Sequence, residues 1–126
     1  MEFIKTFEEA CSKLSLDPLQ ILPNLSFYPK THQKSVIAIS KLFIIAEAVN
    51  EGWKPNWNDR SQYKWFPWFD MEVDENNPSG FRFYASGYVL SFTGTAGGSR
   101  LCFKTKEKSN HVGKIFIDLF RDIMVL

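Results

Sequence analysis

The chain has few of the residues from which small proteins build metal sites and covalent cross-links. Its 126 residues include 2 cysteines and 2 histidines, and no CxxC or Cys/His spacing of a zinc site occurs. Cys11 and Cys102 each lie in an apolar context, which predicts two buried free thiols rather than a disulfide. We therefore expect neither a metal nor another cofactor, and a reducing, cytoplasmic setting.

An excess of charge and a long apolar run are also missing. The 15 basic and 14 acidic residues give a net charge of +1, which provides no overall attraction to nucleic acid or to an anionic membrane. No stretch reaches the roughly 18 apolar residues of a membrane span, and the N-terminus has no basic segment followed by an apolar core. The sequence therefore predicts a soluble protein that has no membrane partner.

The sequence also lacks a recognisable catalytic motif. His32 and His111 have no Cys, Ser or carboxylate at a spacing typical of a nucleophile and its base. The segment TGTAGGSR, residues 93–100, is rich in glycine but lacks the GxxxxGK[ST] spacing of a phosphate-binding loop, and a turn between strands explains its glycines. An acidic run at residues 70–75 is typical of a solvated turn. We expect a protein that is not an enzyme.

Aromatic residues are abundant instead. They make up 16% of the chain, and all four tryptophans lie in EGWKPNWNDRSQYKWFPWF, residues 51–69. Rings at this density build either a core or a binding surface. The alternating pattern that begins at Tyr63 favours the core for Trp65 and Phe69 and leaves Trp57, Phe66 and Trp68 as candidates for the surface.

The periodicity of the apolar residues predicts three helices. Thr6 and Glu9 have the spacing of a capping box and begin a short amphipathic helix. A long helix follows from Thr31, its expected N-cap, to Gly52, which stands where a left-handed residue often ends a helix. The third helix begins after Thr105 and carries apolar residues on one face up to Ile123.

Between the second and third helices, the alternation predicts three strands, at 63–73, 80–92 and 99–103. Pro67 cannot donate a ladder hydrogen bond, so the first strand is expected at an edge or at a bulge. In the second strand the apolar phase changes at Ser86 and Gly87, which predicts a β-bulge there. The expected fold is α+β, a single domain over residues 1–126. Helices pack mainly on one face of a three-stranded antiparallel meander, in the order helix, helix, strand, strand, strand, helix.

Four segments resemble a group of small proteins encoded by bacteriophages and prophages of gut bacteria. They are TFEEACSKLSLDP, LFIIAEAVNEGWKPNW, YKWFPWFDM and GSRLCFKTKEKSNHVGKIF, and together they cover most of the chain. No activity, ligand or catalytic residue is known for that group. The resemblance therefore implies a phage or mobile-element setting and no particular site.

Two functions of a binding or accessory protein remain open. The first is protein–protein interaction through the aromatic edge region, with Trp57, Phe66 and Trp68 as partner-binding candidates. The alternative is binding of single-stranded nucleic acid by tryptophans interleaved with cations, the candidates being Trp53, Lys54, Arg60, Lys64, Arg100, Lys104, Lys106 and Lys108. The acidic run from Asp70 favours the protein partner. Nucleic-acid binding requires segments 53–64 and 100–108 to share one face, whereas partner binding requires Phe66 and Trp68 to be exposed.

Overall fold

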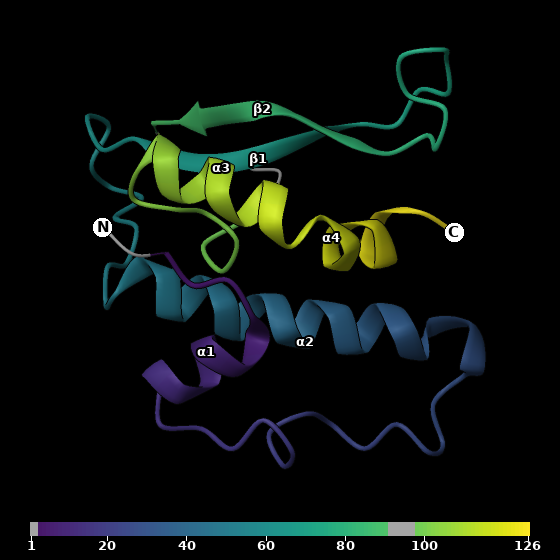
Figure 1. Ribbon diagram of the computed structural model, residues 1–126. Helices are drawn as coiled ribbons and strands as arrows, with labels where there is room; N and C mark the ends of the chain where they lie inside the picture. Colours follow the sequence, from purple (N-terminus) through teal and green to yellow (C-terminus); the bar gives the residue numbers. More distant parts are fainter. Residues whose placement is uncertain (1–2, 91–97) are drawn as a thin grey trace.

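The computed structural model describes residues 3–90 and 98–126, and its fold is α+β (Figure 1). Over these residues, two helices precede a β-hairpin and two more follow it. The elements are α1 (Phe7–Lys13), α2 (Lys30–Asn50), β1 (Lys64–Asp70), β2 (Arg82–Val89), α3 (Lys106–Ile115) and α4 (Ile117–Met124).

The prediction of a three-stranded meander is wrong. In the described part of the chain the sheet has two antiparallel strands, β1 and β2. The expected third strand at 99–103 forms only one isolated bridge, in which Phe103 exchanges two backbone hydrogen bonds with Trp65 at N···O distances of 3.0 and 2.7 Å. The glycine-rich turn expected before it lies, apart from Gly98, outside the described residues.

Pro67 explains why this third pairing ends after one bridge. Backbone groups alternate sides along a strand, so Pro67 faces the same edge of β1 as Trp65. The next pair in this antiparallel register would join Pro67 to Leu101, but proline has no N–H to donate. In the described two-stranded sheet β1 is an edge strand, as predicted from Pro67, and Pro67 also limits the pairing of β1 with residues 101–103.

A bulge in β2 keeps the hairpin in register, although it lies two residues before the predicted position. Trp68 pairs with Ala85 and Phe69 pairs with Phe83, so Tyr84 is the extra residue. The change of phase read at Ser86 and Gly87 therefore arises at Tyr84.

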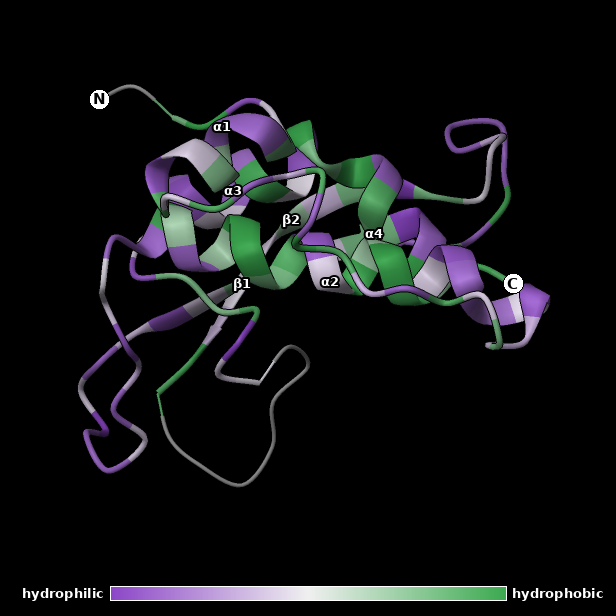
Figure 2. Ribbon diagram, turned by 90° about the horizontal axis from the view of Figure 1, so that it is seen from below, coloured by the Kyte–Doolittle hydropathy of each residue, from purple (hydrophilic) through white to green (hydrophobic). Residues whose placement is uncertain are grey.

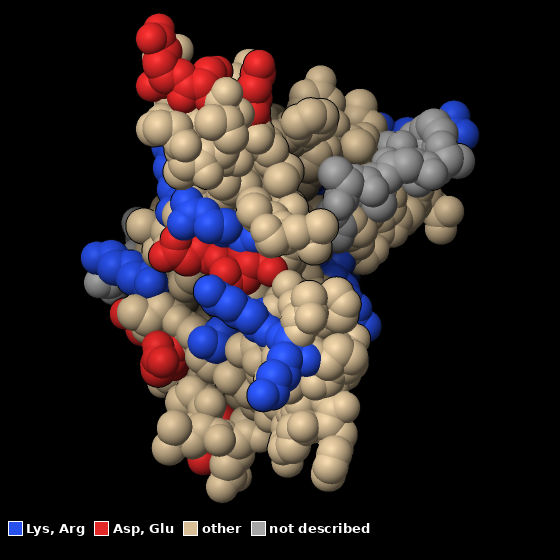
Figure 3. Space-filling model, turned by 90° about the vertical axis from the view of Figure 1, so that its right-hand side faces the viewer, with Lys and Arg blue, Asp and Glu red and all other residues tan. Residues whose placement is uncertain are grey.

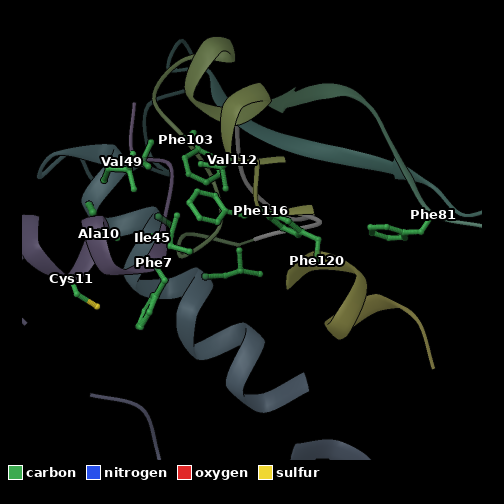
Figure 4. Packing of buried hydrophobic residues seen from close by; sticks show 14 residues of the cluster. Phe7, Ala10, Cys11, Ile45, Val49, Phe81, Phe103, Val112, Phe116 and Phe120 are labelled. Carbon is green, nitrogen blue, oxygen red and sulfur yellow. The ribbon is translucent and has the colours of Figure 1, made fainter. Parts of the chain in front are cut away.

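The elements form layers below the hairpin. α3 packs against one face of both strands, α4 and α1 pack against α2, and Figure 1 shows α2 below α3 and α4. The helices carry hydrophobic residues on their inner sides, whereas the connecting loops are largely hydrophilic (Figure 2). In the core, Phe103, Val112 and Phe116 lie close to Ile45 of α2 (Figure 4). The expectation that helices cover mainly one face of the sheet therefore holds for the described residues.

Local capping signals place α1 and α3. The side chains of Thr6 and Thr105 accept hydrogen bonds from the N–H groups of Glu9 and Lys108, as predicted. Thr31 was predicted to cap α2, but the N-cap is Pro29, two residues earlier, and it provides no side-chain cap. The fixed φ angle of Pro29 and the burial of the apolar side of α2 stabilise the start of this helix in place of a side-chain cap.

The last helical segment was predicted as one helix, and it divides at Phe116. This residue has φ −106° and ψ 28°, and it separates α3 from α4. The break contains neither glycine nor proline. It allows α3 to follow the sheet while α4 packs on α2, with Phe116 and Phe120 both buried in the core. Packing, which the local sequence does not reveal, decides where the helix ends.

Three carboxyl groups, those of Glu51, Asp59 and Asp70, have pKa values below their usual ones, which predicts a fold sensitive to acid. A hydrogen bond from the Glu72 N–H, and hydrogen bonds from Arg82 Nε and Nη2 to one carboxylate oxygen, hold the pKa of Asp70 below its usual value. Lys13 and then Lys108 lower the pKa of Glu51 in the same way. All three pKa values are lower in the folded state than in the unfolded state. The three carboxylates therefore contribute fully to the free energy of unfolding at pH above their unfolded-state pKa values, and this contribution is lost as the pH falls through their folded-state pKa values.

We therefore expect the free energy of unfolding to stay level from pH 7 to pH 5 and to fall below about pH 4. Urea denaturation at a series of pH values measures this. The combined Glu51→Gln and Asp70→Asn variant should be less stable at neutral pH and should lose less on acidification. A variant whose acid profile equals that of the wild type would contradict the assignment.

Both cysteines are buried and free, as predicted. Burial raises the pKa of the Cys102 thiol to about 11. Within residues 3–90 and 98–126, no helix is both long enough and apolar enough to cross a membrane.

Candidate functional site

The three partner-binding candidates have different surroundings. Phe66 is 6% exposed and stacks with Trp68, whose own exposure is 54%; the ring centroids are 6.0 Å apart. Both rings lie over Gly87, on the sheet face opposite α3. Trp57 is half-buried, and its Nε1 donates to Ser99 Oγ at 2.5 Å. Of the three, Trp68 alone presents a large accessible ring.

Lys64, a nucleic-acid candidate, is fully buried with 0% exposure. Its Nζ donates to the backbone carbonyls of Asp59, Gln62 and Leu90 at 3.1, 3.0 and 2.9 Å, and it lies 5.2 Å from the centre of the Trp57 ring. This ammonium group joins the segment before β1 to the end of β2. We call it the Lys64 clamp. Because its donors are satisfied inside the protein, Lys64 is not available to a phosphate.

Lys108 is the second buried candidate. Its Nζ lies 3.4 Å from a carboxylate oxygen of Glu51, whose other oxygen lies 3.6 Å from Lys13. Glu51 is at the C-cap of α2 with φ 51°, so this cluster joins α1, α3 and the end of α2. The sequence marked Lys108 as a surface cation, and the structure gives it a role in joining helices.

The remaining cations lie beside exposed rings that the sequence did not connect. Tyr63, Trp65 and Tyr88 pack with centroid distances of 4.6, 5.2 and 5.8 Å. Tyr63 is 46% exposed and Tyr88 is 50% exposed. Lys106 Nζ lies 6.0 Å from the centre of the Trp65 ring, and Lys104 is exposed two residues before it. We call these five residues the basic aromatic face.

Three further nucleic-acid candidates line one cavity. Trp53, Lys54 and Arg100 meet where the end of α2, residues 52–55 and residues 99–100 come together. The cavity has a volume of about 560 Å³. Among the described residues, its lining is Phe43, Ile44, Glu47, Asn50, Gly52, Trp53, Lys54, Pro55, Ser99 and Arg100, and we call it the α2-end cavity. Arg60 is exposed and belongs to neither this cavity nor the basic aromatic face.

Segments 53–65 and 99–106 lie against each other, so the two segments of the nucleic-acid hypothesis, 53–64 and 100–108, are not on opposite sides of the molecule, but Lys64 and Lys108 are buried and do not contribute to a shared basic face. Three contacts join the segments: the Trp57–Ser99 hydrogen bond, the Trp65–Phe103 bridge and the approach of Lys106 to Trp65. The hypothesis did not include Tyr88. Tyr88 faces Trp65 across the hairpin, and this pairing follows from the register, which the bulge shifts.

The acidic run does not adjoin the basic aromatic face. Asp70 ends β1, whereas Trp65 is near its beginning. Figure 3 views the end of the molecule at which the β1–β2 turn lies, and it shows acidic side chains gathered over that turn, with basic and acidic groups alternating below. Within the residues that the structure describes, no group of three or more His, Cys, Asp or Glu side chains could hold a metal ion.

Phosphate repulsion by the acidic turn therefore acts mainly on the region around Trp68, whereas Tyr63 lies beyond the opposite end of β1 and Tyr88 pairs with Trp65 near that end. Comparison with models of protein families, with curated proteins and with solved structures gave no match.

Proposed function

We propose that the protein is a non-catalytic binding protein that holds single-stranded nucleic acid on the basic aromatic face. The observation that carries this proposal is the cluster of Tyr63, Trp65 and Tyr88, two of them about half exposed, with Lys106 beside Trp65 and Lys104 exposed two residues earlier in the chain. Bases stack on such rings, and adjacent cations contact the phosphates between them. A phage or mobile-element setting rests on the resemblance of the sequence alone.

Three features support nucleic acid over a protein ligand at this place. Trp65 already accepts a cation over its ring, which leaves the outer faces of Tyr63 and Tyr88 for stacking. Lys104 and Lys106 make no ion pair with any described residue, so their charges are available. Arg100 and Lys54 extend the positive charge toward the α2-end cavity.

Fluorescence anisotropy with labelled single-stranded and duplex oligonucleotides at several salt concentrations tests the proposal. Removal of one stacking ring costs about 1–3 kcal/mol per base, so Tyr88→Ala should weaken single-strand binding about 5- to 150-fold. Lys104→Gln with Lys106→Gln should reduce the slope of log K against log salt by about 1.4, because each single-strand phosphate contact contributes about 0.7. Thermal melting verifies that each variant folds.

Trp68→Ser is the matched control, because Trp68 is an equally exposed ring on the opposite face of the sheet. It should leave nucleic-acid binding unchanged. Absence of binding to any oligonucleotide at low salt, or an equal loss in the Trp68 and Tyr88 variants, would refute the proposal.

A protein partner at Trp68 is the second candidate function. Trp68 is 54% exposed on a sheet face that none of α1 to α4 covers, and it lies near the acidic turn, which disfavours phosphate. Such a ring is typical of an interface hot spot. Association with a protein that is lost in Trp68→Ser and retained in Tyr88→Ala would support this second function.

A further inference from the structure

The α2-end cavity has the size and the composition of a ligand site. Its volume of about 560 Å³ lies within the usual range for small-molecule sites. One part of the wall is aromatic and aliphatic, formed by Phe43, Ile44, Trp53 and Pro55. The polar part combines two cations, Lys54 and Arg100, with one carboxylate, Glu47.

The charged groups of this cavity, Glu47, Lys54 and Arg100, form no ion pair within the described part of the protein. The guanidinium of Arg100 lies 5.4 Å from the centre of the Phe43 ring, which holds it at the cavity wall while its donors remain available. A ligand with an anionic group and a hydrogen-bond donor would match this cavity, because the anionic group would contact Lys54 and Arg100 and the donor would contact Glu47.

Hydrogen bonds of Asn50 and a left-handed turn position parts of the cavity wall. Asn50 is buried, and its Nδ2 donates to the Cys102 carbonyl at 2.9 Å while its Oδ1 accepts from the Lys104 N–H at 3.3 Å. The chain then leaves α2 through two left-handed residues, Glu51 with φ 51° and Gly52 with φ 85°. This turn brings Trp53 back along the end of the helix.

We propose that the α2-end cavity binds a nucleoside monophosphate unit, with the base against Trp53 and Phe43 and the phosphate between Lys54 and Arg100. The aromatic walls suit a planar ring, the two cations suit a phosphate, and Glu47 accepts from N–H groups at the edge of a base. The choice of a nucleotide among planar anions rests on the proposed function, because Lys104 joins the cavity floor at Asn50 to the basic aromatic face. The unit is either a free nucleotide or the phosphorylated end of a bound strand.

Calorimetric titration of the folded protein with the four 5′-nucleoside monophosphates, their nucleosides and inorganic phosphate tests the proposal. We expect a monophosphate to bind at least 10-fold more tightly than its nucleoside and than phosphate. Arg100→Gln and Lys54→Gln should each weaken it at least 5-fold, whereas Tyr88→Ala should not. Equal affinity for inorganic phosphate, or tighter binding of tyrosine than of any monophosphate, would overturn the assignment to a nucleotide.

Oligonucleotides with and without a 5′- or 3′-phosphate separate the two sources of the ligand. Tighter binding of a phosphorylated end, lost in Arg100→Gln, assigns the cavity to the end of a strand, and equal affinity for both assigns it to a free nucleotide. Monophosphate binding without oligonucleotide binding would support the cavity and refute the proposed function. Oligonucleotide binding without monophosphate or end-phosphate binding would support the proposed function and refute the nucleotide site in the cavity.

Discussion

Replacement of Lys64 by methionine should lower the free energy of unfolding by about 3 kcal/mol, because a buried acceptor left without its donor costs about 1–3 kcal/mol. Lys64 is 0% exposed, and its ammonium group donates to three backbone carbonyls. Methionine retains the apolar contacts of the stem and provides no donor. Three carbonyls would then be buried without a partner or would open to water.

The matched control is Lys104→Met, the same change at an exposed lysine, which should alter stability by less than about 0.5 kcal/mol. Urea denaturation followed by tryptophan fluorescence measures both variants, and the Trp57 ring beside Lys64 Nζ provides a local signal. Equal stability of the two variants would show that the Lys64 clamp contributes nothing to folding.

Gly113→Ala should also destabilise the protein, by about 1–2 kcal/mol, although alanine is the better helix former by about 1 kcal/mol. A Cβ at Gly113 would lie 2.7 Å from two ring atoms of Phe83 and 2.7 Å from the Cβ of Pro67. Either α3 would move away from the sheet or the Phe83 ring would rotate out of its packing. Both changes remove buried apolar contact.

Lys114→Ala provides the comparison for Gly113, since the adjacent residue is exposed on the same helix. Its cation lies over the Phe83 ring at the surface, and its loss should cost less than about 1 kcal/mol. Thermal and urea unfolding rank the variants. A stabilised Gly113→Ala protein would mean that α3 lies farther from the sheet than described, because only the helix propensity would then remain.

The sequence predicted the elements whose signals are local. Thr6 and Thr105 mark helix starts because their side chains bond to N–H groups three residues away. The α+β class and the two strands of the hairpin also follow from short-range periodicity. The third strand failed because a single proline opposite it prevents further pairing, and alternation within residues 99–103 carries no information about Pro67.

The candidate site was predicted only in part, because exposure depends on contacts far along the chain. Lys64 and Lys108 look like surface cations in the sequence. In the structure, however, Lys64 donates to the carbonyl of Leu90, 26 residues away, and Lys108 donates to the carboxylate of Glu51, 57 residues away. Phe66 was assigned to the exposed side of a strand, and a stacked Trp68 helps to bury it. The meeting of Trp53 with Arg100 likewise requires the complete fold.

The hydrogen bonds of Asn50 also set the order in which this protein can mature. The backbone hydrogen bonds of α2 join residues close in the chain. The side chain of Asn50, its last residue, instead donates to the carbonyl of Cys102, 52 residues downstream, and accepts from the N–H of Lys104, 54 residues downstream. Contacts of such separation form late, after the intervening hairpin has closed the loop. During synthesis, a chain that ends before residue 99 therefore holds one wall of the cavity and lacks the opposite one with Arg100. The proposed ligand binding at the α2-end cavity can begin only after the segment that contains Arg100 has left the ribosome.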